Sequence, residues 1–155
     1  MQRLHPRGIK NGTITPFIWF DTDVQEVAKF YNGIFKNSKV LSTNPMSATI
    51  VINDQKLHLF NGGPHYKLNE AFSLMVSCET QKEIDYYWDK LLAGGGQESR
   101  CGWLKDKYGL SWQIIPDVLG QLIGDKDRQK ADRAMQAMLK MAKLDLAALK
   151  AAHQG

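Results

Sequence analysis

The chain has 155 residues, a length that fits one domain and is short for two independent ones. Its content of 43% hydrophobic and 23% charged residues is ordinary for a soluble globular protein. No apolar run approaches the roughly 18 residues that a membrane span needs, and the N-terminal residues lack the apolar core of a signal peptide. The net charge of +4 is spread among acidic residues, which argues against a nucleic-acid partner. We therefore expect a cytoplasmic protein with neither a membrane nor a nucleic-acid partner.

The first predicted elements are a strand and a capped helix. After a disordered head over residues 1–12, a strand is expected over 14–20. Asp23 with Glu26 three residues later is typical of a capping box, and large apolar residues then recur with the period of a helix that has one buried face. The sequence predicts this helix over 24–35.

Three further strands complete the first half of the chain. The run 48–52 is rich in β-branched residues, which suits a strand, and Asn53-Asp54 is typical of a turn. Strands are therefore expected over 38–42, 48–52 and 56–60, followed by a loop over 61–65.

The second half repeats this order of elements. A strand expected over 72–77 precedes a helix over 81–93, and Thr80 with Glu83 forms a second capping box at its start. The remaining predicted elements are a glycine breaker at 94–96, strands around 97–105 and 110–115, and a turn at 106–109 between them.

The two predicted helices are copies of one pattern. Tyr31 of the first helix and Trp88 of the second are 57 positions apart, and the residues around them correspond at the same spacing. A repeat of this length is one supersecondary unit, and such a unit must bury its apolar face against its copy. The chain is thus expected to contain two tandem units.

A region of a different kind follows the repeats. Residues 126–142 are expected to form a helix with a stripe of alanine, methionine and leucine. Asp145 is expected to cap another helix, with Leu144 and Leu149 in contact across its first turn. We interpret the stripe as packing on the sheet or on a partner chain, although a methionine-rich stripe also suits an adaptable binding surface.

Several short motifs together resemble one family. They are Thr15-Pro-Phe-Ile-Trp-Phe-Asp21, Phe30-Tyr31, Asn61-Gly-Gly-Pro-His65, Cys78-Glu-Thr80, Tyr86-Tyr-Trp-Asp-Lys90, Cys101-Gly-Trp-Leu-Lys-Asp-Lys-Tyr-Gly109 and Ser111-Trp-Gln-Ile-Ile-Pro116. This pattern, over residues 14–152, is similar to the PhnB-like branch of the vicinal oxygen chelate superfamily of glyoxalases, bleomycin resistance proteins and dioxygenases. That branch is often labelled 3-demethylubiquinone-9 3-methyltransferase domain.

The resemblance implies an α+β, glyoxalase-like fold. Two tandem βαβββ units, 13–65 and 70–116, would form open half-barrels within one domain over 13–155, with C-terminal helices over 117–155. The resemblance also implies a homodimer, and a small-molecule ligand on the concave side of the sheets.

The resemblance also indicates where a metal would bind. In metal-dependent relatives the first and last strands of each unit supply the ligands, usually His or Glu. The corresponding positions here are near Pro16, His58, Ser73 and Gln113. Of these only His58 is a good ligand, whereas a catalytic zinc usually takes three ligands from the protein. We therefore expect no bound metal.

His58 is the candidate catalytic residue. Strand alternation places it with Phe60 on the face opposite Leu57 and Leu59, and the repeat makes that face the ligand side. A histidine there could transfer protons near neutral pH, and the alternative is a structural histidine. The predicted ligand-binding set is Ile18, Phe20, His58, Phe60, Met75, Trp103 and Gln113.

Other reactive or aromatic side chains have simpler interpretations. His65 is expected in a loop, and Cys101 as a small buried hydrophobe more than as a nucleophile. Cys78 and Cys101 are expected to be free thiols. Trp19, Trp103 and Trp112 are interpreted as core residues, although aromatic walls also suit an apolar pocket.

The methyltransferase label conflicts with the predicted fold. S-adenosylmethionine is usually bound by a doubly wound sheet with a glycine-rich turn after the first strand, whereas Asp21-Thr-Asp23 follows the first strand here. The glycines at 94–96 follow a helix, so they end it. We therefore expect no cofactor and no methyl transfer.

Three functional hypotheses remain. The first is a protein that binds a small apolar or amphipathic molecule in the barrel cavity. The alternative is a metal-assisted lyase, isomerase or dioxygenase that uses His58. The third is an interaction protein that acts through its C-terminal helix. The metal content of the purified protein separates the first two.

Overall fold

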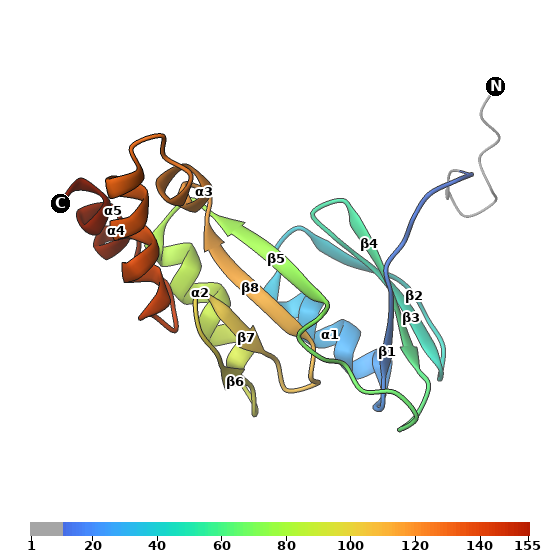
Figure 1. Cartoon of the computed structure of the whole chain (residues 1–155). Coiled ribbons are helices and arrows are strands. Elements are labelled where there is room, and N and C mark those ends of the chain that lie inside the picture. The colour runs from blue at the N-terminus through green and yellow to red at the C-terminus, as the bar shows by residue number, and fades with distance from the viewer. Residues whose placement is uncertain (1–10) are drawn as a thin grey trace. The chain divides into compact units, whose positions relative to one another are not determined.

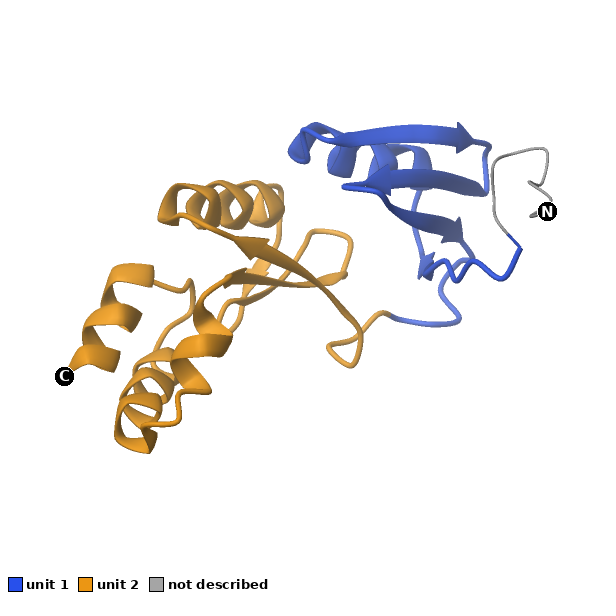
Figure 2. Cartoon of the chain, turned by 90° about the horizontal axis from the view of Figure 1, so that it is seen from above, with its two compact units in different colours: residues 1–67 blue, residues 68–155 orange. Residues whose placement is uncertain are grey.

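The computed structural model describes residues 11–155, which divide between two compact units, residues 1–67 and 68–155 (Figure 2). Most of the head predicted over 1–12 lies outside the described residues. The elements follow one another in the predicted βαβββ order in each unit, and additional helices follow the second sheet (Figure 1). The α+β fold with two βαβββ units is confirmed.

Unit 1 consists of one mixed sheet and one helix. Its elements are β1 (Phe17–Phe20), α1 (Val24–Ile34), β2 (Ser38–Thr43), β3 (Ser47–Ile52) and β4 (Gln55–Asn61). The strand order is β1-β4-β3-β2, with β1 parallel to β4 and the other neighbours antiparallel. β1 begins three residues after the predicted start at residue 14, because its paired register with β4 begins at Phe17.

The helix of unit 1 covers one face of this sheet. The Asp23 side chain accepts a hydrogen bond from the Gln25 N–H and so caps α1. The apolar stripe of α1 packs against β2, β3 and β4, and Tyr31 on this stripe is fully buried. Burying these apolar side chains is the main term that stabilises the unit. The core of unit 1 contains Ile18, Phe20, Val24, Val27, Ala28, Tyr31, Ile34, Phe35, Ala48, Ile50, Ile52, Leu57 and Leu59.

The sheet of unit 2 has the same topology. Its elements are β5 (Ser73–Cys78), α2 (Gln81–Leu92), β6 (Gln97–Glu98), β7 (Trp103–Lys105) and β8 (Ser111–Pro116). The order is β5-β8-β7-β6, again with the first and last strands parallel. Thr80 caps α2 by accepting from the Glu83 N–H, and Trp88 is buried on the stripe that faces the sheet.

The strand predicted around 97–105 is in fact two short strands. Cys101 and Gly102 between them both have positive φ, 59° and 84°, which no strand residue adopts. Their N–H groups donate to the carbonyls of Met141 and Ala142 in place of a strand partner. The segment therefore reverses direction and joins the sheet to the C-terminal region.

Three helices follow the sheet of unit 2: α3 (Leu119–Ile123), α4 (Arg128–Leu139) and α5 (Leu146–Gln154). The helix predicted over 126–142 is shorter at both ends, because Asp127 caps its start and Lys140 ends it. The short helix α3 was not predicted. The α4 stripe packs on α3 and α5 more than on the sheet, which corrects the predicted packing on the sheet. Leu144 and Leu149 are fully buried in one cluster with Leu119, and Met138 and Met141 pack against it.

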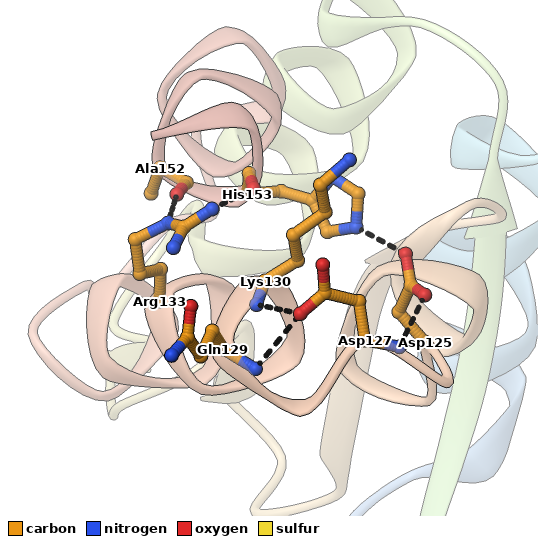
Figure 3. Close-up of polar contacts among 7 residues, drawn as sticks. All are labelled: Asp125, Asp127, Gln129, Lys130, Arg133, Ala152 and His153. Carbon is orange, nitrogen blue, oxygen red and sulfur yellow. Dashed lines mark hydrogen bonds and ion pairs between the residues drawn. The ribbon is translucent and has the colours of Figure 1, made fainter.

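Polar contacts hold the end of α5 against the neighbouring segments (Figure 3). His153 Nε2 lies 2.8 Å from Asp125 Oδ2, and Arg133 donates to the carbonyls of Ala152 and His153 at 3.0 Å. The hydrogen bond from the Asp127 N–H and the contact with His153 lower the pKa of Asp125. The closing turn of the chain is therefore fixed by hydrogen bonds in addition to the apolar cluster.

No helix within residues 11–155 is both long enough and apolar enough to cross a bilayer.

Candidate functional site

The sheet of unit 1 has one face that α1 does not cover. The parallel register pairs Phe17 with His58 and Trp19 with Phe60, so these four side chains share that face. Leu57 is buried on the helix side, which confirms the predicted alternation in β4. With Tyr66 from the loop after β4, we call these five residues the aromatic face.

The rings of the aromatic face contact one another in a continuous series. Phe17 stacks on His58 with ring centroids 5.0 Å apart, and it lies 5.4 Å from Phe60. Trp19 meets Phe60 edge-on at 5.2 Å and Tyr66 at 4.9 Å. Phe17 is 60% exposed and Tyr66 is 68% exposed. An exposed cluster of touching rings on a rigid sheet is a surface suited to an apolar or aromatic molecule.

Two glycines fix the position of Trp19. The Trp19 indole N–H donates to the Gly63 carbonyl at 2.9 Å. A Cβ on Gly62 would lie 2.2 Å from the indole ring, so only glycine allows the ring to occupy this place. The sequence Asn61-Gly-Gly, predicted as a loop, therefore serves to support the aromatic face.

His58 is held by a hydrogen bond from its other side. Its Nδ1 lies 3.0 Å from the Thr49 hydroxyl, and β3–β4 pairing places these two residues directly opposite each other. With Nδ1 engaged and the ring stacked on Phe17, Nε2 is the atom left to meet a ligand. This geometry suits hydrogen bonding or proton transfer, and it is also what a structural histidine would show.

Two members of the predicted ligand set lie on the wrong face. Ile18 and Phe20 are each 2% exposed and belong to the core beneath α1. Phe17 and Trp19 take their places on the open face. All residues of β1 are apolar, so its sequence does not show which side chains face outward. The pairing of β1 with β4, in which polar and apolar residues alternate, identifies them.

The open face of unit 2 carries the other predicted residues. Met75, Gln113 and Trp103 form one row across β5, β8 and β7, as their register shows. Gln113 Nε2 donates to the Ser73 hydroxyl at 2.9 Å. Met75 is 61% exposed. These three predicted residues are thus brought together, on a face more polar than that of unit 1.

The four positions that the resemblance indicated for a metal, near Pro16, His58, Ser73 and Gln113, do not form a metal site here. The Pro16 carbonyl accepts the His58 backbone N–H at 2.9 Å, and the Ser73 hydroxyl accepts from Gln113. Among residues 11–155 no three His, Cys, Asp or Glu side chains are grouped for a metal ion. One imidazole with neutral oxygens does not fit a divalent catalytic centre.

The remaining reactive groups lie elsewhere. Cys78 and Cys101 are free thiols, as predicted. Burial raises the pKa of Cys78 to about 11, which makes its thiolate rare at neutral pH. His65 is exposed in a loop, and Cys101 is half-buried in the β6–β7 turn.

The tryptophans divide between core and open faces. Trp112 is buried, and its indole N–H donates to Asp106 at 2.9 Å, as suits a core residue. Trp19 and Trp103 are only half-buried and lie on the open faces of their sheets.

The connection after β1 also does not suit a nucleotide-type cofactor. Asp23 uses its side chain to cap α1, and Asp21 and Thr22 complete the link without a glycine. The residues present thus do not form the glycine-rich turn of a doubly wound cofactor-binding sheet.

Comparisons with known proteins agree with this architecture. Residues 12–115 match the family described as 3-demethylubiquinone-9 3-methyltransferase. A putative 3-demethylubiquinone-9 3-methyltransferase, the PhnB protein of Bacillus cereus, is 30% identical with a TM-score of 0.60, covering 67% of this chain and 98% of its own. A comparison with curated proteins finds no match.

More distant structures share the fold. The fosfomycin resistance protein FosX of Listeria monocytogenes, solved with Mn(II) and sulfate, has a TM-score of 0.56 at 12% identity, covering 72% of this chain and 94% of its own. Protein PA1353 of Pseudomonas aeruginosa has a TM-score of 0.54 at 17% identity, covering 68% and 98%. The family match ends at residue 115, so the helices α3, α4 and α5 lie beyond it.

Proposed function

This chain belongs to the 3-demethylubiquinone-9 3-methyltransferase family, the PhnB-like branch of the vicinal oxygen chelate superfamily, and we propose that it binds a small apolar or amphipathic molecule. The aromatic face of unit 1 is the proposed binding surface. Phe17, Trp19 and Phe60 would contact the apolar part of the ligand, and His58 would hydrogen-bond its polar part.

The observation that carries this proposal is the exposure of the aromatic face. Soluble sheets normally present polar side chains on an uncovered face. Here Phe17 is 60% exposed and stacked on His58, and Trp19 is positioned by the Gly63 carbonyl. A surface whose rings are already fixed in place loses little conformational entropy on binding.

His58 supports a second candidate function. Its Nδ1 is engaged by Thr49, which orients Nε2 as a general acid or base in a lyase, isomerase or dioxygenase reaction. A metal-assisted version is the weaker proposal, because Pro16, Ser73 and Gln113 are poor ligands. Metal analysis of the purified protein tests it, since about one zinc or manganese ion per chain would favour the enzyme.

Methyl transfer is not part of the proposed function. The link between β1 and α1 has no glycine-rich turn for S-adenosylmethionine. Calorimetry is expected to show no saturable binding of S-adenosylmethionine tighter than about 100 μM, which corresponds to roughly 5.5 kcal/mol. Tighter binding would contradict this part of the proposal.

We further propose that the protein is a homodimer. End strands of both sheets carry exposed apolar side chains outside the aromatic face, among them Leu41 on β2 and Met75 on β5. Exposed apolar strands at sheet edges favour association with another chain. Light scattering at micromolar concentration should give about twice the 17.5 kDa chain mass, and the mass of one chain would refute the dimer.

Extraction of co-purified small molecules tests the binding proposal. Mass spectrometry of extracts from the wild-type protein should show an apolar or amphipathic compound in amounts comparable to the protein. Phe60→Ala should lose it, because the variant removes the ring that contacts both Phe17 and Trp19. Leu139→Ala is the matched control, since Leu139 is 48% exposed on α4 of unit 2. Equal amounts from both variants would contradict the proposal.

A further inference from the structure

A small groove opens beside the sheet of unit 2, and Trp103 is the one member of the predicted ligand-binding set that lines it. It has a volume of about 150 Å³ and lies along β6, β7 and the start of β8. At about 30 Å³ for each water in the liquid, this is room for a molecule of about five non-hydrogen atoms. Its lining includes Glu70, Gln97, Trp103, Lys105 and Ser111.

Lys105 is the cation of this groove. Its Nζ lies 2.7 Å from Glu70 Oε1, and the two side chains are 34% and 64% exposed. The hydrogen bond from Lys105 lowers the pKa of Glu70. An ion pair this exposed contributes little to folding and separates readily. The Glu70 carboxylate thus forms an ion pair with Lys105 that the carboxylate of a ligand can replace.

Ser111 supplies an unpaired hydroxyl next to this lysine. It is 2% exposed, and its Oγ has no hydrogen-bond partner among the described residues. Cross-strand pairing places Ser111 directly beside Lys105 on the same face of the sheet. A buried hydroxyl without a partner is unfavourable, so this atom is available to bond a ligand that enters the groove.

The other acidic residue of the groove points away from this face. Glu98 pairs with Leu104, and its carboxylate accepts the Trp88 indole N–H at 3.1 Å on the helix side. Gln97 and Trp103 lie on the open face with Lys105. Glu70 is therefore the acid that competes for Lys105.

We propose that this groove binds a small monocarboxylate. One carboxylate oxygen would replace that of Glu70 on the Lys105 ammonium, and the other would accept the Ser111 hydroxyl proton. Trp103 would contact the short apolar part of the ligand. A single lysine neutralises one negative charge, and the volume admits acids of about two to four carbons. The carboxylate of Glu70 then acts as an internal competitor that closes the site when no ligand is present.

Titration with sodium propionate tests this proposal. Two-dimensional NMR spectra of the isotope-labelled full chain, at constant ionic strength maintained with sodium chloride, should show saturable shifts of the Lys105, Ser111 and Trp103 signals. Lys105→Met should weaken binding by about tenfold or more, and Ser111→Ala by about fivefold, because each removes a donor to the carboxylate. Glu70→Gln should strengthen binding by about threefold, because it removes the competing charge.

The controls distinguish specific carboxylate binding in the groove from general electrostatic effects of charged residues or salt. Lys107→Met removes a neighbouring lysine that does not line the groove, and it should leave the affinity unchanged. Propionamide, the neutral isostere, should produce no saturable shifts. The increase expected for Glu70→Gln cannot arise from misfolding. Equal shifts with propionamide or sodium chloride, unchanged affinity in Lys105→Met, or weaker binding in Glu70→Gln would each overturn the proposal.

Discussion

The two units have the same arrangement of strands and helix, but the open face of unit 1 is aromatic and that of unit 2 is more polar. In unit 1 the pair of parallel strands β1 and β4 presents touching aromatic rings around His58. In unit 2 the corresponding strands β5 and β8 present serine, glutamine and methionine, with Lys105 on the neighbouring β7. The helix-facing sides of both sheets remain apolar.

This difference indicates which positions build the fold and which are free to vary. The helix-facing residues must fill a close-packed core, so a change there costs stability in either unit. The open face carries no such requirement, and the two units differ there. We therefore look for function on the open faces and for stability under α1 and α2.

The largest effect is expected from replacing the large buried aromatic residue that each helix packs against its sheet. Tyr31→Ala and Trp88→Ala should each lower the free energy of unfolding by about 3–5 kcal/mol, because each leaves a large cavity between helix and sheet. Urea denaturation followed by circular dichroism measures these losses.

His58→Ala is the matched comparison on the open face. It gives up one hydrogen bond to Thr49 and leaves no enclosed cavity, so it should cost only about 1 kcal/mol. If His58→Ala unfolds the protein as readily as Trp88→Ala, the division between scaffold and open face is wrong for this residue.

The next largest effect concerns the turn in unit 2. Asp106 is 3% exposed, and its carboxylate accepts the N–H groups of Tyr108 and Leu110 and the Trp112 indole. Asp106→Ala should cost about 3 kcal/mol, because it leaves these donors unpaired beneath the surface. The melting temperature of the variant measures the loss.

Unit 1 has a different turn at the equivalent place. There Asn53 and Asp54 both have positive φ and form an exposed two-residue turn. Asp54→Ala should cost only about 1 kcal/mol, because alanine tolerates the positive φ of 68° less well than aspartate does. A loss in Asp106→Ala as small as that expected for Asp54→Ala would show that the Asp106 network does not stabilise unit 2.

Gly62 offers a way to disturb the aromatic face alone. Gly62→Ala must displace the Trp19 indole, since the new Cβ would lie 2.2 Å from it, and we expect a loss of about 2 kcal/mol. Gly33→Ala is the control within the same unit. It lies in α1 with no atom near its Cβ position, so it should stabilise the protein by about 0.5 kcal/mol. A blue or red shift of tryptophan emission confined to Gly62→Ala would confirm the displacement, and its absence would argue against it.

The smallest effect is a pH dependence at the C-terminal end of unit 2. The pKa of Asp125 is lower in the folded protein than its usual value of 3.8. Its contribution to stability is therefore present above pH 3.8 and is lost as the pH falls through the folded pKa. Wild type should be more stable than Asp125→Asn at pH 6, and the difference should shrink below about pH 4. A difference that grows in acid would contradict this sign.

The sequence was informative wherever a short-range rule decides the structure. Each N-cap depends only on a hydrogen bond between one side chain and a backbone N–H in the first turn of its helix. The structure contains all three predicted caps, Asp23, Thr80 and Asp145. The alternation of β4 between polar and apolar residues was equally local, so the outward direction of His58 was predictable.

Other features depend on contacts distant in sequence. The direction of the β1 side chains follows from pairing with β4, about forty residues later, and for this reason Phe17 and Trp19 were missed. The reversal at Cys101 depends on carbonyls of Met141 and Ala142. The Lys105 groove needs the loop at Glu70 beside two strands of the sheet. None of these contacts has a local signal.

The most direct test of the central claim is an NMR titration with 2-naphthol, a small neutral aromatic probe. If the aromatic face of unit 1 is the binding surface, the Trp19 indole N–H and the amides of His58 and Phe60 should shift saturably, with the signals of unit 2 unchanged. Phe60→Ala should abolish these shifts, and Leu139→Ala should preserve them. Absence of saturable shifts, or shifts confined to unit 2, would contradict the assignment of the ligand surface to unit 1.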